Sequence, residues 1–253
     1  MKEEVQILAI LQARTSSTRL PGKVLMEING MPVIGRQIHR IMRSRKISKL
    51  VLATSTDISD DALVDFVSNL GLTVFRGSLN NVFSRFEEII RKQDFEVIVR
   101  LTGDCPLVMP EIIDQAIEAY LNQNVDYLSN ALLPTYPDGL DVEVFSKNAF
   151  LKLAKYELNS LELEHVTLGF INRYSDFSLH NLTSKENLAE LRWTLDYVED
   201  LTYIRKVYSY FEGKEEIFNF EDILNLLAVH PELINQKSGK FRNIASRTLK
   251  GDS

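Results

Sequence analysis

The chain has 253 residues, of which 45% are hydrophobic and 25% are charged, and its formal net charge is −6. A chain of this size and composition is typical of a soluble globular protein with one α/β domain and an elaboration, and its acidic balance argues against nucleic acid as a partner. The single cysteine, Cys105, excludes an intramolecular disulfide and a Cys-rich zinc site.

The N-terminal residues lack the features of a signal peptide. Glu3 and Glu4 stand where such a peptide needs positive charge without acids, and no small-residue cleavage site follows. No apolar run approaches the ~20 residues that a membrane span needs. We therefore expect a cytoplasmic protein with no membrane partner.

Strands and helices alternate through the first half of the chain. Short apolar runs rich in branched residues predict buried strands, and apolar residues at helical spacing predict helices. The predicted strands are Val5–Ala13, Lys49–Ala53, Thr73–Phe75 and Val97–Leu101, and the predicted helices are Pro32–Arg43, Asp60–Asn69, Val82–Lys92 and Glu111–Asn122. This alternation predicts a three-layer, doubly wound, mostly parallel sheet that binds ligands at the carboxyl ends of its strands.

The pattern changes after Asp126. Strands are predicted at Tyr127–Asn130, Leu140–Phe145, Phe177–Asn181 and Leu191–Thr194, and helices at Ser146–Glu157, Leu161–Asn172, Leu201–Phe211 and Phe220–Ala228. No linker rich in Gly, Ser or Pro marks a boundary. We predict a single domain over residues 1–235 with an insertion at about 126–181, and a basic tail at 236–253 whose composition favours poor order.

The stretch between the first strand and the first helix is strongly basic. Arg14, Arg19 and Lys23 lie within ten positions of one another together with four hydroxyl side chains, and Pro21-Gly22 breaks the chain between them. A loop that follows a strand, exposes backbone N–H groups and carries cations without local acids suits a polyphosphate. On composition alone, a solvated connection explains this loop as well.

Charge is unevenly distributed along the chain. Between Val5 and Thr56 there are nine Lys or Arg residues and one acid, Glu27. A basic N-terminal fifth in an acidic protein is consistent with a local anion site. Arg36, Arg40 and Arg43 follow helical spacing, however, so a solvent-facing helix also explains part of this excess.

Two aspartates follow predicted strands and are candidate metal ligands. Asp104 lies just past the fourth strand in R-L-T-G-D-C-P, at the edge of the sheet that carries the basic loop, and Asp196 lies in L-R-W-T-L-D-Y-V-E-D. A turn-forming role explains Asp104 from local sequence as well, and an N-cap role explains Asp196. Glu199 and Asp200 fit the acids that helices favour in their first turn.

The string Q-A-R-x-x-S-T-R-L-P-G-K at residues 12–23 matches neither glycine-rich phosphate signature. It resembles the opening motif of sugar-activating cytidylyltransferases, in particular the group of spore-coat polysaccharide protein F and the CMP-sialate and CMP-ketodeoxyoctonate synthetases. The strings around Asp104 and Asp196 resemble the family elements R-x-T-G-D-C-P and R-x-T-V-D-x-x-E-D, so the resemblance spans roughly Ile7 to Asp200. It implies a nucleotide-diphospho-sugar transferase-like fold and a Mg²⁺ ion held by Asp104 and Asp196.

The same resemblance implies which residues bind the nucleotide. Ala53-Thr54-Ser55 resembles the family's turn near the base, and residues 75–85 resemble its R-G-x-x-x-x-V-x-x-R segment, with Arg76 and Arg85 as candidates. Asn81 stands where that segment carries an acid, and a surface salt bridge explains Arg85 as well. The implied nucleotide-binding residues are Gln12, Ala13, Arg14, Arg19, Lys23, Thr54, Ser55, Arg76 and Thr102, and the implied catalytic residues are Arg14, Lys23, Asp104 and Asp196.

The insertion supplies candidates for contacts to the acceptor. P-D-G-L-D-V-E-V-F places Asp141 and Glu143 on one face of a predicted strand, and E-H-V-T contributes His165. With Arg192, these residues are candidates for binding sugar hydroxyls or an acidic sugar, and His165 is also a candidate base. Solvent-facing strand positions explain the two acids as well, and a lone histidine is more often structural.

We therefore expect a Mg²⁺-dependent cytidylyltransferase that transfers CMP from CTP to a sugar or sugar-acid hydroxyl and releases pyrophosphate, in the synthesis of polysaccharide precursors. The resemblance also implies a homodimer with the segment around residues 132–172 as its arm. Two alternatives stay open. One is a metal-dependent glycosyltransferase, although the chain lacks Asp-x-Asp, and the other is a non-catalytic nucleotide-binding protein.

Overall fold

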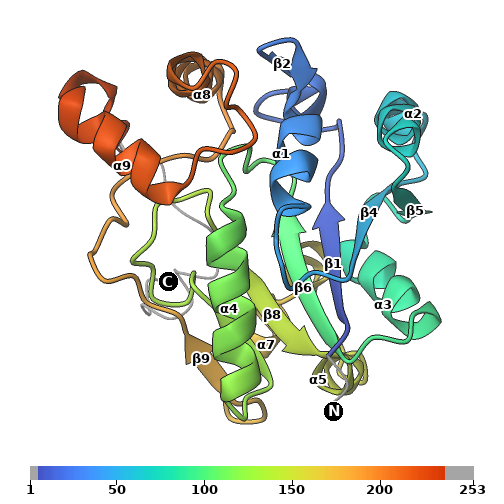
Figure 1. The fold of residues 1–253 in the computed structure, drawn as a ribbon. Coiled ribbons are helices and arrows are strands. Elements are labelled where there is room, and N and C mark those ends of the chain that lie inside the picture. The colour runs from blue at the N-terminus through green and yellow to red at the C-terminus, as the bar shows by residue number, and fades with distance from the viewer. Residues whose placement is uncertain (1–4, 237–253) are drawn as a thin grey trace.

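The computed structural model describes residues 5–236, and in this part of the chain seven strands form one sheet in the order β5-β4-β1-β6-β8-β7-β9 (Figure 1). β8 pairs antiparallel with β6 and β7, whereas the other pairings of this sheet are parallel. The strands are β1 Ile7–Gln12, β4 Lys49–Ser55, β5 Thr73–Gly77, β6 Val97–Thr102, β7 Tyr127–Ser129, β8 Glu143–Ser146 and β9 Leu179–Asn181. The predicted basic tail, apart from Gln236, lies outside the described residues.

Two layers of helices enclose the sheet. Alternate residues of β1 point into two separate apolar clusters, so the strand is buried on both faces, as parallel strands usually are. One face is covered by α1 Val33–Ile41, α2 Asp61–Asn69, α4 Pro110–Asn122, α8 Val198–Tyr210 and α9 Phe220–Val229. The other is covered by α3 Val82–Lys92, α5 Lys147–Leu153, α6 Ser160–His165 and α7 Leu168–Asn172. The predicted three-layer, mostly parallel α/β fold is confirmed.

The register of the central strands determines where the site is built. Gln12, at the end of β1, lies opposite Ala53 of β4 and Thr102 of β6. The chain segments that follow these three strands therefore leave the sheet at one edge. The loop of residues 13–22 runs from this edge to a short 3₁₀ helix, η1 Lys23–Leu25, and then to the two-stranded ribbon of β2 Glu27–Ile28 and β3 Met31–Pro32.

The helix predicted over Leu161–Asn172 is interrupted in the structure. It divides into α6 and α7 at Val166, a fully buried residue with φ of +49°. The Thr167 amide donates to the His165 carbonyl (2.5 Å), which closes a turn too tight for a helix. The side chain of Thr167 explains the break, because its hydroxyl reaches Glu143 of β8 (2.5 Å).

The strand predicted at Leu191–Thr194 is also different in the structure. Arg192, Trp193 and Leu195 donate their backbone N–H groups to three separate segments, at the carbonyls of Asn235, Asp138 and Asp104. Only isolated bridges form there instead of a ladder. The segment consequently joins the end of β6 to the loop before β8, and it carries Asp196 to the same edge of the sheet.

Gly139 permits this close approach of the two segments, so we predict that Gly139→Ala is strongly destabilising. The glycine has φ of +105°, and a Cβ atom there would lie 2.5 Å from the Thr194 nitrogen. Gly213 is a matched control, because its φ is +75° and a Cβ atom added there would have no neighbour within 4 Å. Positive φ alone should cost Gly213→Ala about 1–2 kcal/mol, whereas crowding should cost Gly139→Ala about 1–3 kcal/mol more. Urea denaturation of both variants measures the difference, and equal losses would contradict this packing argument.

Candidate functional site

A cleft of about 470 Å³ opens at the carboxyl edge of the parallel strands. Its walls come from the basic loop, from the end of β6 and from the loops before β8 and α8. Most residues predicted from sequence line this cleft, namely Gln12, Ala13, Arg14, Arg19, Lys23, Thr102, Asp104, Asp141, His165, Arg192 and Asp196. The predicted residues Thr54, Ser55, Arg76 and Glu143 lie outside that lining.

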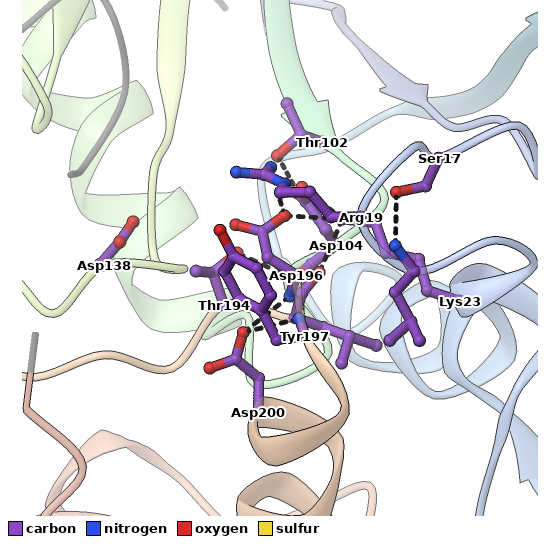
Figure 2. Close-up of polar contacts among 12 residues, drawn as sticks. Ser17, Arg19, Lys23, Thr102, Asp104, Asp138, Thr194, Asp196, Tyr197 and Asp200 are labelled. Carbon is purple, nitrogen blue, oxygen red and sulfur yellow. Dashed lines mark hydrogen bonds and ion pairs between the residues drawn. The ribbon is translucent and has the colours of Figure 1, made fainter. Parts of the chain in front are cut away.

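Lys23 lies between the two predicted metal-binding aspartates. Its Nζ atom is 3.1 Å from Asp104 Oδ2, 3.0 Å from Asp196 Oδ1 and 2.6 Å from the carbonyl oxygen of Leu195. Figure 2 shows the two carboxylates drawn together from separate segments of the chain. Burial acts to lower the pKa of Lys23, but the two carboxylates outweigh it and the pKa is raised. The ammonium is therefore charged in the free protein.

The basic loop is held in a tight conformation. The carbonyl of Thr15 accepts hydrogen bonds from the amides of Ser17 and Gly22 (2.8 Å each). Gly22 has φ of +72°, a conformation that glycine adopts without strain, and it directly precedes η1. Lys23 is the first residue of η1, so its side chain leaves a fixed backbone, and the residue is only 7% exposed.

Asp104 is positioned by the end of β6. The amide of Gly103 donates to the Gln12 carbonyl (2.8 Å), which joins the β6 end to the start of the basic loop. Thr102 donates its hydroxyl to Asp104 Oδ1 (2.8 Å). Burial acts to raise the pKa of Asp104, but the nearby Lys23 ammonium and the Thr102 hydroxyl lower it. Asp104 is therefore an anion near neutral pH.

Asp196 is positioned by Arg192 and Asp200. Arg192 Nη2 lies 3.1 Å from Asp196 Oδ2 and 2.9 Å from Asp200 Oδ2, and its Nη1 lies 3.1 Å from Asp138 Oδ2. Asp200 also accepts the amides of Asp196 and Tyr197. α8 begins after Tyr197, so Asp196 is not its N-cap residue. Arg192 is only 2% exposed, and its contact with Asp196 Oδ2 fixes the orientation of that carboxylate.

The two aspartates fit a hard cation such as Mg²⁺. Asp104 Oδ2 and Asp196 Oδ1 both accept from the same ammonium group, so these two oxygens face one point in space. Mg²⁺ prefers oxygen ligands and commonly takes one or two carboxylates, with phosphate and water at its other positions. Among residues 5–236, no group of three or more His, Cys, Asp or Glu side chains is arranged to hold a metal.

Two further arginines border the basic end of the cleft. Arg14 is half-exposed and lies 3.3 Å from Glu164. Arg85 is buried and donates to the carbonyls of Ser78 (2.6 Å) and Leu79 (2.8 Å). Burial, with a contribution from Arg14, lowers the pKa of Arg85 to about 10. Arg85 therefore binds backbone carbonyls and does not form the surface salt bridge that was the alternative explanation for this residue.

The hydroxyls of Thr54 and Ser55, which were predicted near the base, bind a buried acid that the sequence did not indicate. Asp60 is fully buried and accepts five hydrogen bonds, from the amide and hydroxyl of Thr15, the hydroxyl of Thr54, and the amide and hydroxyl of Ser55. It thereby ties the basic loop to the end of β4. Arg76 lies nearby and pairs with Asp61 (2.7 Å) at the surface.

Glu143, one of the acceptor candidates of the insertion, belongs to a second network centred on Arg100, the first residue of the R-x-T-G-D-C-P element, which was not itself predicted as a site residue. Arg100 of β6 donates to Glu143 and to Gln12 Oε1 (3.1 Å), and it lines the cleft. Glu143 also accepts the hydroxyl of Tyr127 (2.6 Å), so this acid is not a solvent-facing strand residue. Burial and the nearby Arg100 lower the pKa of His165, which keeps its imidazole neutral near pH 7.

A family model described as cytidylyltransferase matches residues 8–225. The spore coat polysaccharide biosynthesis protein SpsF of Bacillus subtilis is 33% identical over 238 residues, which cover 91% of this chain and 98% of that protein. The resemblance identified from motifs is therefore confirmed.

Solved structures agree with this assignment. A cytidylyltransferase from Leptospira borgpetersenii serovar Hardjo-bovis superposes with a TM-score of 0.85 at 27% identity, covering 93% of this chain and 98% of that one. A CMP:2-keto-3-deoxy-manno-octonic acid synthetase complexed with CTP has a TM-score of 0.62 at 14% identity, with 81% and 99% covered. The second similarity supports the nucleotide-diphospho-sugar transferase fold alone. Within residues 5–236, no helix has the length and apolarity of a membrane span.

Because Asp60 holds the basic loop, we predict that Asp60→Asn lowers both stability and nucleotide affinity. An amide has one acceptor oxygen fewer, so it leaves donors of Thr15, Thr54 or Ser55 unpaired at about 1–3 kcal/mol. Asp61→Asn is a matched control, because Asp61 is half-exposed and its ion pair is at the surface. Urea denaturation and CTP titration would measure the two effects.

The same variant should alter the dependence of stability on pH. Burial acts to raise the pKa of Asp60, but hydrogen bonds from Ser55, Thr15 and Thr54 outweigh it, so the folded-state pKa is lowered. Such a carboxylate stabilises the fold above its unfolded pKa, and this stabilisation is lost as pH falls through the folded pKa. The difference between wild type and Asp60→Asn should therefore shrink in acid. A difference that is constant with pH would contradict the role of the charged carboxylate.

Proposed function

Since this chain belongs to the cytidylyltransferase family and is a nucleotidyltransferase, we propose that it transfers CMP from CTP to a sugar or sugar-acid hydroxyl with the help of Mg²⁺ and releases pyrophosphate. The observation that carries this proposal is the convergence of Lys23, Asp104 and Asp196 in a cleft that arginines also line. The relative named for spore-coat polysaccharide biosynthesis supports a role in glycan precursor synthesis.

The basic loop is proposed to bind the β- and γ-phosphates. Arg14, Arg19 and Lys23 supply charge. The amides of Thr15, Ser17 and Gly22 are bonded within the protein, so we assign the role of phosphate donor to the other backbone N–H groups of the loop. These groups neutralise the pyrophosphate as it leaves, which is where negative charge accumulates in phosphoryl transfer. No nucleophilic side chain is needed for this chemistry.

Asp104 and Asp196 are proposed to hold Mg²⁺ through Oδ2 and Oδ1. The ion would act as a Lewis acid on the α-phosphate and would assist deprotonation of the acceptor hydroxyl. Arg192 and Asp200 keep Asp196 in place, and Thr102 keeps Asp104 in place. The protein thereby fixes the geometry of reacting groups before the substrate arrives, which is the main contribution that positioning makes to catalysis.

The insertion is proposed to bind the acceptor and to form a homodimer. Asp141 and His165 of the insertion line the cleft together with Arg192, and the contact between Arg100 and Glu143 links the insertion to β6. In the proposed arm at 132–172, Leu133 and Leu161 are exposed to 61% and 47%. Apolar side chains of this kind are compatible with an interface between two copies.

We predict that CTP stabilises the protein more than UTP, ATP or GTP does, and that Mg²⁺ increases the effect. A ligand at one hundred times its dissociation constant adds about 2.7 kcal/mol to the free energy of unfolding. Thermal-shift measurements with each triphosphate, with and without Mg²⁺, check this expectation. A shift with nucleotide diphosphate sugars and none with any triphosphate would instead favour the glycosyltransferase, and tight CTP binding without turnover would favour a non-catalytic protein.

We predict that Lys23→Ala lowers turnover by about 10²-fold or more, as the loss of one charge-stabilising donor does in other transfer reactions. Pyrophosphate release measures this with the acceptor that a screen of sugars and sugar acids identifies. Lys92→Ala is the control, because the Lys92 side chain is 64% exposed on α3, remote from the cleft lining. Near-normal turnover of Lys23→Ala would remove this ammonium from the mechanism.

A further inference from the structure

We propose that Lys23 is an internal counter-cation that closes the aspartate pair to metal ions in the free enzyme and opens it when a nucleoside triphosphate binds. The inference rests on the proposed function, and it adds the order in which nucleotide and metal bind. Metal would enter with the triphosphate or after it, and it would not bind first.

The free protein holds Lys23 firmly between the carboxylates. A lysine ammonium has three N–H donors, and the three acceptors within reach are Asp104 Oδ2, the Leu195 carbonyl and Asp196 Oδ1, at 2.6–3.1 Å. The side chain is 8% exposed, so water competes weakly for these donors. Asp104 Oδ2 and Asp196 Oδ1 are the two oxygens best placed to share a metal ion, and in the free protein both already bind the Lys23 ammonium.

Asp196 Oδ1 accepts from a second cation, and the other two carboxylate oxygens are also engaged. Asp196 Oδ1 accepts from Arg19 as well (2.5 Å), Asp196 Oδ2 accepts from Arg192 (3.1 Å), and Asp104 Oδ1 accepts from Thr102 (2.8 Å). A divalent ion that entered here would lie within a few ångströms of the Lys23 ammonium and the Arg19 guanidinium. Like charges at such distances repel strongly in a partly buried site. The aspartate pair should consequently bind metal weakly as long as both cations stay.

The three cations around the pair differ in their freedom to leave. Arg192 is buried and is also held by Asp138 and Asp200, so it belongs to the fixed frame. The Arg19 side chain is 51% exposed, and Lys23 has a flexible four-carbon stem. Both extend from the loop that is proposed to bind the β- and γ-phosphates. A triphosphate therefore competes with the aspartates for these two cations, and it leaves Asp104 Oδ2 and Asp196 Oδ1 available to a metal.

The direct test is a titration of the full chain with Mn²⁺ in the absence of nucleotide, in which electron paramagnetic resonance measures how much Mn²⁺ is bound. Wild type should bind Mn²⁺ weakly, and Lys23→Met should bind it at least about tenfold more tightly, since it removes one charge at short range. The added site should disappear in Lys23→Met/Asp196→Asn. Lys92→Met is the matched control and should bind as wild type does. Wild type that binds Mn²⁺ as tightly as Lys23→Met would overturn the proposal.

A second measurement needs only the wild-type protein and stays decisive if Lys23→Met does not fold. In equilibrium dialysis, CTP should increase the Mn²⁺ retained by the protein, whereas CMP should not, because CMP lacks the β- and γ-phosphates that compete for Lys23 and Arg19. Equal retention with CMP and CTP would overturn the inference. Failure of CTP to stabilise the protein would instead count against the proposed function, so the two failures are distinguishable.

Discussion

The arrangement of the site depends on one buried ammonium group, that of Lys23, held between the carboxylates of Asp104 and Asp196. Three chain segments must meet to make this contact, and the register between β1 and β6 brings two of them to the same edge of the sheet. Removing charges from water costs energy that a buried ion pair often fails to recover. We therefore explain this cluster by its role in placing the charged groups at the cleft, and not by a contribution to the stability of the fold.

Buried carboxylates elsewhere support that cluster. Asp60 accepts five hydrogen bonds from the basic loop and the end of β4, and Asp200 accepts from Arg192 and from two backbone amides. Both acids are almost inaccessible to solvent, at 0% and 2% exposure, and each satisfies donors of a loop that carries a functional side chain. A fixed frame of this kind allows Lys23 and Arg19 to exchange partners while the acids that face the cleft keep their positions.

Local sequence was sufficient for the fold and for the residues that lie on motifs. Branched apolar runs predicted the central strands to within a few residues, and position after a strand indicated that Asp104 and the basic loop share one edge. The role of Arg100 was not predictable, because its partners Gln12 and Glu143 come from distant segments. Asp60 and Asp200 also bind residues only three to eight positions away, but the periodic patterns that predict strands and helices do not specify such contacts. Thr54 and Ser55 were predicted to form a turn after a strand, but they are the last two residues of β4 and their hydroxyls bind Asp60. Leu191–Thr194 has strand composition, but its N–H groups are divided among separate neighbours.

The interruption between α6 and α7 is a further feature that depends on contacts with another segment of the chain. Val166 is β-branched and buried, and a positive φ at such a residue costs on the order of 1–3 kcal/mol. A continuous helix would avoid that cost, but it would not deliver the Thr167 hydroxyl to Glu143, which also binds Arg100 and Tyr127. The strain thus accompanies a polar network beside the cleft, in the part that we propose binds the acceptor, and His165, directly before the strained residue, lines the cleft.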